Sequence, residues 1–556
     1  MEQVYIMIRS AKVPKVCYTK IMSFRKNNLR SLDFDEIAIG PTKEEAELVS
    51  RTWAGEFRET IFDRINEAPY AALFSEKENS RPNVPVNVII SLLTLKELFG
   101  QTDEEAIASL LFDSRYKFAL RTAELKNQIT NVSVLTRFRK KAVKHLEETG
   151  TDLIKNTFKE LEKEIEKLMG ITGTKKRIDS MMIAANIKRL GRLELLYECV
   201  SDAVREIEKR GGKIPEELRH YTEKSDRNKE FYHKKDGESY EERAERLIKE
   251  CEAAKKIIEE KEETKESAAA KNLARVILEQ TVEEDGKRRL KKENEGMGSE
   301  ILQNPADPDA TYRKKAGKEH RGYVANIEES VGENGSLVSD YDVKKNTYSD
   351  KQFLKDSLEK SERQDEPRTI VADGAYASEE NRKLAEEKNI SLVTTSLTGK
   401  ETEDVCADFE LGENDREVAR CPLGHVPEKC SFSEKTGEIT AYFGSEKCAL
   451  CPFRDKCHAK IGKKNARVRI SRAKKERAIS QRFMKSNQGL EMYKFRNGVE
   501  SLPSQYRRAF HADKIPQRGL SHLLISYGIK TMGLNFKKYL AYKRNTSKKE
   551  AESRAA

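Results

Sequence analysis

Two aspartates stand at positions where an acid could do chemistry. Asp179 lies in KRIDSMMIAAN, which is expected to form a strand, and Asp373 ends the hydrophobic strand in TIVADGAYAS. A carboxylate at the C-terminal end of a parallel strand faces the crevice in which open α/β sheets bind their ligands. Asp373 is followed by Gly374, and Asp-Gly is also a common turn pair, so each acid alone could equally be a turn or cap residue.

The cysteines have a spacing that is typical of a metal site. Five of the nine cysteines fall between Cys421 and Cys457, and Cys448 and Cys451 form a Cys-x2-Cys pair. This pattern predicts a tetrahedral structural zinc, while the alternative is a group of reduced thiols without metal. An iron–sulfur cluster could use the same ligands, although nothing in the sequence indicates redox chemistry. The expected zinc ligands are Cys421, Cys448, Cys451 and Cys457, with Cys430, His425 and His458 in reserve.

Several motifs of common enzyme classes are missing from the sequence. It contains no G-x-x-x-x-G-K-[ST], no G-x-G-x-x-G, no G-x-S-x-G and no H-E-x-x-H, which removes the usual evidence for ATP-driven, hydride-transfer, serine-hydrolase and zincin activities. Lys and Arg number 105 against 94 Asp and Glu, a formal net charge of +11, which favours a polyanionic partner only as a bias. The start of the sequence has no apolar leader, so a cytoplasmic protein is expected.

The N-terminal part is predicted to be a lead-in followed by a helical domain. Residues 1–50 form the lead-in, and residues 51–170 show apolar residues at a spacing of three to four, as in NVIISLLTLKELFG. The basic residues of one expected helix are Arg137, Arg139, Lys140, Lys141 and Lys144. They either contact DNA phosphates or form an ordinary solvated helix face, and both interpretations stay open.

Residues 171–545 have the pattern of an α/β domain with two insertions. KRIDSMMI predicts a first strand, HRGYVANIEESV and GSLVSDYDV a hairpin, and RTIVADGAY and ISLVTTS two later strands that alternate with helices. This order is typical of a mixed sheet with covering helices. The charged segment 190–298 is expected to form long helices or a helical hairpin rather than a compact core, either as a solvated insertion or as a DNA-binding arm. Residues 400–485 form a Cys-rich insertion, and residues 546–556 are expected to be a disordered tail.

Several of these segments resemble those of bacterial insertion-sequence DDE transposases. TIVADGAYASEENRKLAEEKNISLV is similar to their second-acid segment, including Tyr376, Ser378 and Asn381, and KRIDSMMIAAN is similar to their first-acid segment. The segment QNPADPDATYRKKAGKEHRGYVANI, with Asp307 and Asp309, resembles the one before the second strand. The resemblance extends over most of residues 60–545.

The C-terminal part resembles the Tyr-x2-Arg-x3-Glu-x6-Lys signature of the same transposases. Tyr493, Arg496 and Glu500 match that signature, while Arg507 stands where lysine is usual. The substitution keeps the charge but changes its shape. A second departure is the sequence Asp-Gly-Ala-Tyr after the second acid, where Asp-x-Gly-Tyr is more usual. Neither departure removes an acid.

The resemblance implies an RNase H-like catalytic domain preceded by an all-α domain. Asp179, Asp373 and Glu500 would hold two Mg²⁺ or Mn²⁺ ions, and Tyr493, Arg496 and Arg507 would contact DNA. Cutting DNA requires an in-line displacement at phosphorus, in which two cations about 3.5–4 Å apart stabilise the attacking and leaving oxygens.

The implied function is that of a homodimer on DNA which binds the terminal inverted repeats of its element, cleaves there and transfers the strands to target DNA. Such a bacterial protein would be associated with the nucleoid. A DDE nuclease without strand transfer and a catalytically inactive or domesticated DNA-binding protein are the alternatives.

Glu500 has two competitors for the place of the third acid, Glu476 and Glu491. Tyr493, Arg496 and Glu500 recur at steps of three and four, which would align them on one helix face. The alternative is an ordinary i,i+4 ion pair between Arg496 and Glu500, worth about 0.3–0.5 kcal/mol. Pro503 does not fit a continuous helix and indicates a break just after the acid.

Overall fold

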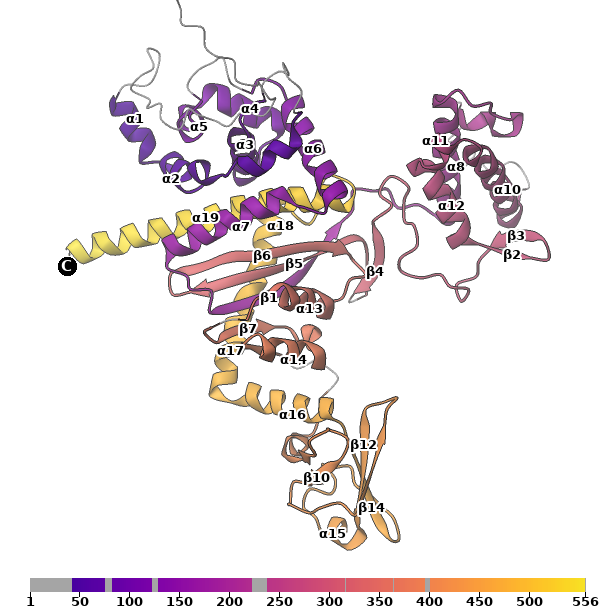
Figure 1. Ribbon diagram of the computed structural model, residues 1–556, viewed down its shortest axis with the longest axis vertical. Helices are drawn as coiled ribbons and strands as arrows, with labels where there is room; N and C mark the ends of the chain where they lie inside the picture. Colours follow the sequence, from indigo (N-terminus) through magenta and orange to yellow (C-terminus); the bar gives the residue numbers. More distant parts are fainter. Residues whose placement is uncertain are drawn as a thin grey trace, which may run out of the picture. The chain divides into compact units, whose positions relative to one another are not determined.

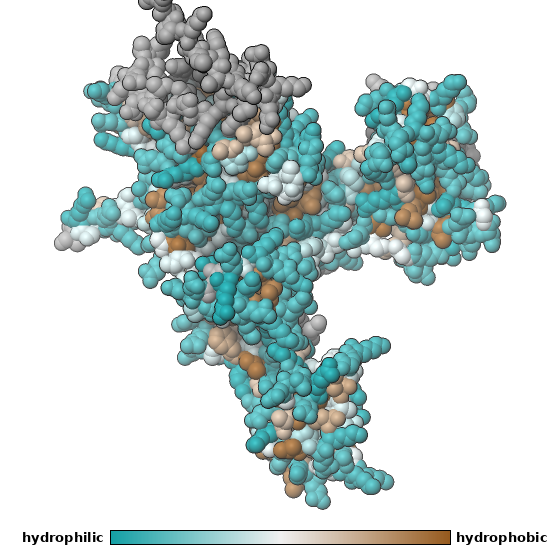
Figure 2. Space-filling view, viewed as in Figure 1, coloured by the Kyte–Doolittle hydropathy of each residue, from teal (hydrophilic) through white to brown (hydrophobic). Residues whose placement is uncertain are grey.

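The computed structural model describes residues 43–75, 83–122, 129–222, 238–315, 317–363, 365–395 and 401–555 (Figure 1). The chain divides into two compact units, Met1–Thr157 and Phe158–Ala556, each of which is described by itself. Most of the expected lead-in, residues 1–42, lies outside the described residues. In the part of the chain that is described, no helix is both long and apolar enough to cross a membrane. The face seen in Figure 2 is mostly hydrophilic, as 36% charged residues would suggest.

The first unit is helical, as predicted from its periodicity. Its central helix α3 is buried at every position from Val86 to Leu95, because apolar residues occupy all of its faces. The helix ends at Gly100, which adopts φ +65°, a left-handed conformation that glycine allows at low cost. The helices are α1 (Lys43–Ser50), α2 (Trp53–Thr60), α3 (Val86–Phe99), α4 (Asp103–Phe112), α5 (Ser114–Ala119) and α6 (Ser133–Thr149), with the short η3 (Phe62–Arg64) and η4 (Ala68–Leu73).

The boundary of this unit differs from the expected one at residue 170. The unit ends at Thr157, within helix α7 (Leu153–Met169), and the rest of α7 belongs to the second unit. There, Phe158 packs edge-on against the Tyr341 ring and Lys159 donates to the Ser339 carbonyl at 2.6 Å. The sequence gives no sign of a boundary within a continuous helix, because the apolar periodicity is the same on both sides of the residue where the helix changes its packing partner.

The second unit is built on a six-stranded mixed sheet in the order β4-β5-β1-β7-β8, with β6 also paired to β5. Strand β1 is antiparallel to β5 and parallel to β7, which is parallel to β8. The predicted order of strands and helices is confirmed. The strands are β1 (Lys175–Ala184), β4 (Thr311–Lys315), β5 (Lys318–Gly332), β6 (Gly335–Lys345), β7 (Arg368–Ala372) and β8 (Ile390–Thr394).

The two faces of this sheet have different chemistry. On one face, Ile178, Val324 and Ile370 form an apolar core with helices α13 (Asp350–Lys360) and α14 (Glu379–Glu387). The other face packs against α19 (Leu520–Ala555), where Asn535 exchanges two hydrogen bonds with the backbone of Val338 on β6. Helix α19 continues to Ala555, so the expectation of a disordered tail over 546–556 is wrong for all but the last residue, which is not described.

The charged insertion between β1 and β4 has a hydrophobic core of its own, which corrects the expectation for residues 190–298. Helix α8 is buried at ten positions and packs against α10 and α12. The sparse apolar residues of α10 and α12 pack against α8, which forms the interior of this core. The elements are α8 (Arg192–Lys209), η6 (Glu216–Thr222), α10 (Tyr240–Glu259), α11 (Glu262–Lys265), α12 (Ala268–Gln280), β2 (Thr281–Glu284) and β3 (Lys287–Leu290).

The basic hairpin of this insertion is neutralised by nearby acids. Arg288 pairs with Glu252 and Glu283, and Arg289 pairs with Glu284 and Glu295. These ion pairs lie at the surface, where they are weak, so both interpretations of the insertion, solvated or DNA-binding, stay open.

The Cys-rich insertion after β8 also has its own sheet and core. Its strands pair in the order β11-β12-β14-β13, and Ile439, Phe443 and Val468 are buried beneath them. Helices α16 to α18 then return to the central sheet. The elements are η8 (Asp404–Asp408), β9 (Glu410–Leu411), β10 (Val418–Arg420), β11 (Lys429–Ser433), β12 (Glu438–Gly444), α15 (Ser445–Ala449), β13 (Lys460–Ile461), β14 (Asn465–Ile470), α16 (Arg472–Lys485), α17 (Asn487–Asn497), η9 (Gly498–Glu500) and α18 (Ser501–Phe510).

Glu162 on α7 is a buried acid that should destabilise the fold at neutral pH. Burial and the neighbouring Glu166 raise its pKa well above the usual 4.5. The folded protein therefore retains a proton that the unfolded chain releases, and stability falls as the pH rises above about 4.5. We expect Glu162→Gln to raise the free energy of unfolding by about 1–2 kcal/mol at pH 8 and to leave it unchanged near pH 4.5.

Urea denaturation at the two pH values measures this difference. The control is Glu160→Gln, which removes an exposed carboxylate from the same helix and should change stability little at either pH. A loss of stability for Glu162→Gln at pH 8, or an equal gain at both pH values, would contradict the prediction.

Candidate active site

The register of two parallel strands brings Asp179 and Asp373 to the same edge of the central sheet. Arg177 on β1 is paired with Val371 on β7. Asp179 lies two residues beyond Arg177, and Asp373 lies two residues beyond Val371, so both side chains leave the same face of neighbouring strands. Burial raises the pKa of Asp179 to about 6, and the negative charge of Asp373 adds to this rise, while Arg496 and Lys315 oppose it.

The two carboxylate oxygens of Asp373 have different partners: one caps a helix and the other faces Arg496. Its Oδ1 accepts hydrogen bonds from the Gly374 N–H at 2.6 Å and the Thr395 hydroxyl at 3.0 Å, which caps the short helix η7 (Gly374–Tyr376). The cap interpretation is therefore correct for one oxygen. The other, Oδ2, lies 3.7 Å from Nη2 of Arg496. Thr395 was not predicted from the sequence, although its position at the end of β8, beside β7, could have indicated it.

Arg496 lies between two of the predicted acids. Its Nη2 faces Asp373, and its Nη1 lies 3.4 Å from Oε1 of Glu500. The Arg496 side chain is only 14% exposed, whereas that of Glu500 is 64% exposed. The i,i+4 ion pair expected as the alternative thus exists, but the same guanidinium also reaches Asp373.

The helix is interrupted at Glu500, as Pro503 indicated. Helix α17 ends at Asn497, Gly498–Glu500 forms the 3₁₀ turn η9, and α18 begins at Ser501. Pro503 lies in the first turn of α18, where its missing N–H has no helical partner to lose. The buried Tyr506, whose hydroxyl lies 2.9 Å from that of Thr531 on α19, anchors the segment that follows.

The competing acids have different surroundings. Glu476 is engaged by Arg382 at 3.1 Å and by Arg472 at 2.8 Å, at the wall of a pocket of about 330 Å³ behind Gly374 and Thr395. Glu491 is exposed on α17, nine residues before Glu500. Of these three acids, Glu500 is the one that shares an arginine with Asp373.

Two family models match this chain. The model described as Transposase DDE domain matches residues 420–540, and the model described as Transposase domain (DUF772) matches residues 48–141. Both matches support an insertion-sequence DDE transposase. The first match includes Glu500, α17, α18 and the first part of α19, whereas Asp179 and Asp373 lie outside it. No curated protein and no solved structure gives a significant match.

Three residues that follow Asp373 support the fold around it. The buried Tyr376 donates its hydroxyl hydrogen to Asn326 at 2.7 Å, and Ser378 caps α14. Asn381 donates to the carbonyls of Tyr376 and Lys351. These three residues therefore fix the loop after Asp373 rather than adding reactive groups.

Asp307 and Asp309 have a similar supporting role at the terminal helix. Asp307 accepts hydrogen bonds from the Gly519 N–H at 3.2 Å and from the Tyr323 hydroxyl, and Asp309 accepts one from the Leu520 N–H at 3.3 Å. These acids satisfy amides at the start of α19, where a negative charge is favoured.

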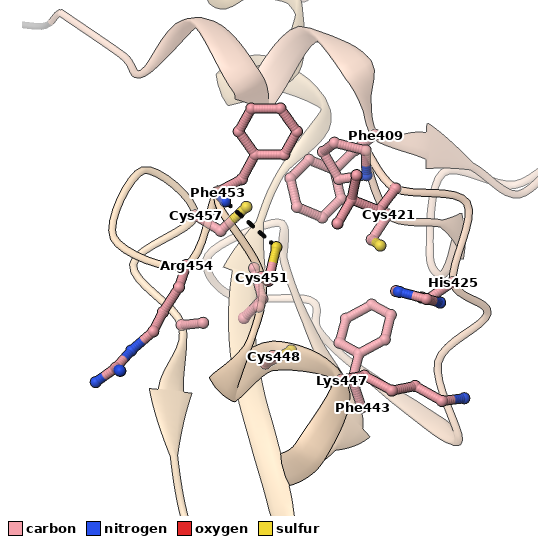
Figure 3. A pocket seen from close by; sticks show the side chains of 14 residues that line it. Phe409, Cys421, His425, Phe443, Lys447, Cys448, Cys451, Phe453, Arg454 and Cys457 are labelled. Atoms are coloured by element: carbon pink, nitrogen blue, oxygen red, sulfur yellow. Dashed lines mark hydrogen bonds between the residues drawn. The ribbon is translucent and has the colours of Figure 1, made fainter.

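The Cys-rich insertion brings the four predicted cysteines to one pocket, which Figure 3 shows from close by. Cys421, Cys448, Cys451 and Cys457 line it together with His425, and the Cys451 sulfur accepts the Phe453 N–H at 3.4 Å. Burial raises the pKa of Cys457 to about 12, and its cysteine neighbours add to the rise.

The reserve ligands separate into two groups. His425 shares the pocket, while Cys430 exchanges hydrogen bonds with the backbone of Val418, and His458 is not among the lining residues. The buried Cys406 also lies near enough to affect the pKa of Cys457 and was not predicted. Throughout the described ranges, no three His, Cys, Asp or Glu side chains are close enough to form a metal site, either here or at the acids.

The predicted DNA-binding residues differ in their availability. On α6, Arg137 and Lys140 are exposed, whereas Arg139 makes a bidentate ion pair with Asp103 of α4 at 2.6 and 2.7 Å. In the second unit, Tyr493 is 45% exposed and Arg507 is exposed, as is the neighbouring Arg508, which was not predicted. Arg139 therefore links two helices, because its guanidinium is occupied.

Proposed function

We propose that the transposase holds two Mg²⁺ or Mn²⁺ ions with Asp179, Asp373 and Glu500 and uses them to cut DNA at the inverted repeats of its element. The observation that carries this proposal is the parallel register that places Asp179 beside Asp373, with Glu500 joined to Asp373 through Arg496. The strand order, with its antiparallel second strand and parallel later strands, supports an RNase H-like sheet.

The donor set fits a hard divalent cation. All three candidate ligands are carboxylates, which Mg²⁺ prefers, and a guanidinium already lies between two of them. When bound, the cations would stabilise the attacking and leaving oxygens of an in-line displacement at phosphorus. Asp179, Asp373 and Glu500 would hold these ions.

Arg496 has two successive roles in this proposal. Without cations it neutralises Asp373 and Glu500, whose repulsion would otherwise push the turn η9 away from the sheet. Its Nε is buried and has no hydrogen-bond partner among the residues that the structure describes. The guanidinium would then turn to a DNA phosphate, for which its planar fork is suited, and Tyr493 and Arg507 would also contact DNA.

The first unit would bind the transposon ends through phosphates, and the product 3′ hydroxyls would be joined to target DNA. Two ends must be held together for that reaction, so we infer a homodimer on DNA. The Cys-rich insertion would hold a structural zinc with Cys421, Cys448, Cys451 and Cys457. The chemistry of four thiols around one pocket supports this ligand set.

The third acid is tested by neutralising each candidate separately. We expect Glu500→Gln to lower Mg²⁺-dependent cleavage of an end-containing duplex by more than about 100-fold, because even an outer-shell partner of a metal costs about 10–100-fold. Glu476→Gln and Glu491→Gln are the matched controls and should cleave within a few-fold of the parent, roughly the effect of a remote surface change.

The same assay with pre-cut ends and a target plasmid separates strand transfer from hydrolysis. Cleavage without joining would indicate the nuclease alternative, and DNA binding without either reaction would indicate the inactive one. A Glu500→Gln protein that folds, binds the end and cuts at the parental rate would refute the assignment of the third acid.

The end-binding surface is tested by its salt dependence. Removing Arg137 and Lys140 together, as the Gln variants, should weaken end binding and lower the slope of log K against log salt by about 0.9 for each lost phosphate contact. Arg139→Gln should act mainly on stability, because Arg139 pairs with Asp103. Fluorescence anisotropy at several salt concentrations measures the slope. The same slope in the double variant and the parent would rule this surface out.

The zinc site is tested by elemental analysis of protein purified without added metal. We expect about one zinc per chain, lost in Cys451→Ser because a tetrahedral site needs all four ligands. Cys430→Ser is a control from the same insertion and should keep the metal, since Cys430 bonds to Val418. A folded protein that cleaves DNA and contains no zinc would exclude the site.

A further inference from the structure

Arg177 connects the strand that carries Asp179 to the segment that carries Glu500. It lies two residues before Asp179 on β1, so the two side chains leave the same face of the sheet. Its Nη1 donates to the carbonyl oxygen of Phe495 at 3.0 Å, and Phe495 is the residue before Arg496. The Arg177 side chain is 11% exposed, so this contact is made almost out of water.

The guanidinium of Arg177 is held on its other side as well. Its Nε donates at 2.6 Å to Oε2 of Glu329, the residue directly opposite on β5. Glu329 is 1% exposed, and its second oxygen accepts from Nζ of Lys538 on α19. One carboxylate therefore orients Arg177 from β5 and leaves Nη1 directed at the end of α17.

Gly498 makes this close approach possible. A Cβ atom at Gly498 would lie 2.0 Å from Nη1 of Arg177, well inside contact distance. The backbone of Gly498 has φ −59°, which any residue adopts, so the glycine is needed here for space. The contact also suits the helix end, because carbonyls of the last turn lack partners and carry negative charge.

We propose that Arg177 is a positioning residue for the reaction: with Gly498, it docks the end of α17 on β1 and so sets the distance of Arg496 and Glu500 from Asp179 and Asp373. The effect on cleavage rests on the proposed function, whereas the docking of α17 on β1 does not. Among the described residues Arg177 makes no hydrogen bond or ion pair with Asp179, Asp373 or Glu500, and it acts through the backbone of the segment 495–500.

Hydrogen exchange of the full-length protein tests the docking without any need for activity. We expect the amides of 495–502 to exchange about 10-fold faster in Arg177→Lys, because a lysine can keep the charge beside Glu329 but cannot also bridge to the Phe495 carbonyl. Gly498→Ala should have the same effect from the opposite side, although alanine ordinarily stabilises a helical position. Lys538→Met, which removes the other partner of Glu329, is the control and should leave 495–502 protected.

The metal dependence of cleavage tests the consequence for the acids. Arg177→Lys and Gly498→Ala should raise the half-saturating Mg²⁺ concentration by about 10–100-fold while end binding is retained, as expected when ligand placement is loosened. Parental exchange of 495–502 in both variants, or an unchanged Mg²⁺ dependence in an active enzyme, would overturn the proposal. A parental protein that folds, protects 495–502 and fails to cleave with Mg²⁺ would instead overturn the proposed function alone.

Discussion

The need to neutralise charge on one face of the central sheet determines how the C-terminal part of the chain packs. Along β1 the side chains alternate, so Ile178 enters the apolar core while Arg177 and Asp179 leave the opposite face. A buried charge is costly unless it is paired and hydrogen-bonded. Glu329 supplies that partner for Arg177 and takes Lys538 from α19 in addition. An apolar sheet face can pack against many different helices. This face also needs a helix that supplies a charged partner for Glu329, as α19 does with Lys538.

The need to pair charges also applies to the acids at the ends of the strands. Asp373 already gives one oxygen to a cap, and its other oxygen faces Arg496, which also reaches Glu500. Neighbouring carboxylates repel one another, and a guanidinium on a nearby helix end offsets that repulsion. The arrangement joins the turn that carries Glu500 to the strand end that carries Asp373.

The sequence predicts the parts of this arrangement that depend on local patterns. Strand periodicity predicts β1, β5, β6, β7 and β8, and Pro503 indicates the break after Glu500. The partners of charged residues are harder to predict, since nothing near Arg139 in the sequence indicates that Asp103 occupies its guanidinium. The pairing of Arg177 with Phe495 is equally non-local, because it joins residues that two insertions separate.

Packing partners explain the remaining differences between expectation and structure. The core of the charged insertion depends on α8, whose apolar residues lie on the sides that face α10 and α12. The hydrophobic core of the insertion can be predicted only when the apolar residues of all three helices are considered together. The end of α19 has no buried face, and its polar sequence therefore indicated disorder where the structure has helix.

The two insertions also explain why the segment that carries Glu500 needs a docking contact. Each has its own core and enters a connection of the sheet, so only its two ends are constrained by the sheet. Closing a long loop costs little more free energy than closing a short one, because the entropy grows only with the logarithm of its length. The fold thus tolerates the insertions, but chain connectivity no longer determines where α17 ends. That position has to come from contacts such as Arg177 with Phe495, and from the amides at the start of α19 that Asp307 and Asp309 satisfy. The distance of Glu500 from the sheet is therefore set by contacts of its own segment, such as Arg177 with Phe495 and the buried side chains of Val499 and Leu502, rather than by the chain that leads to it.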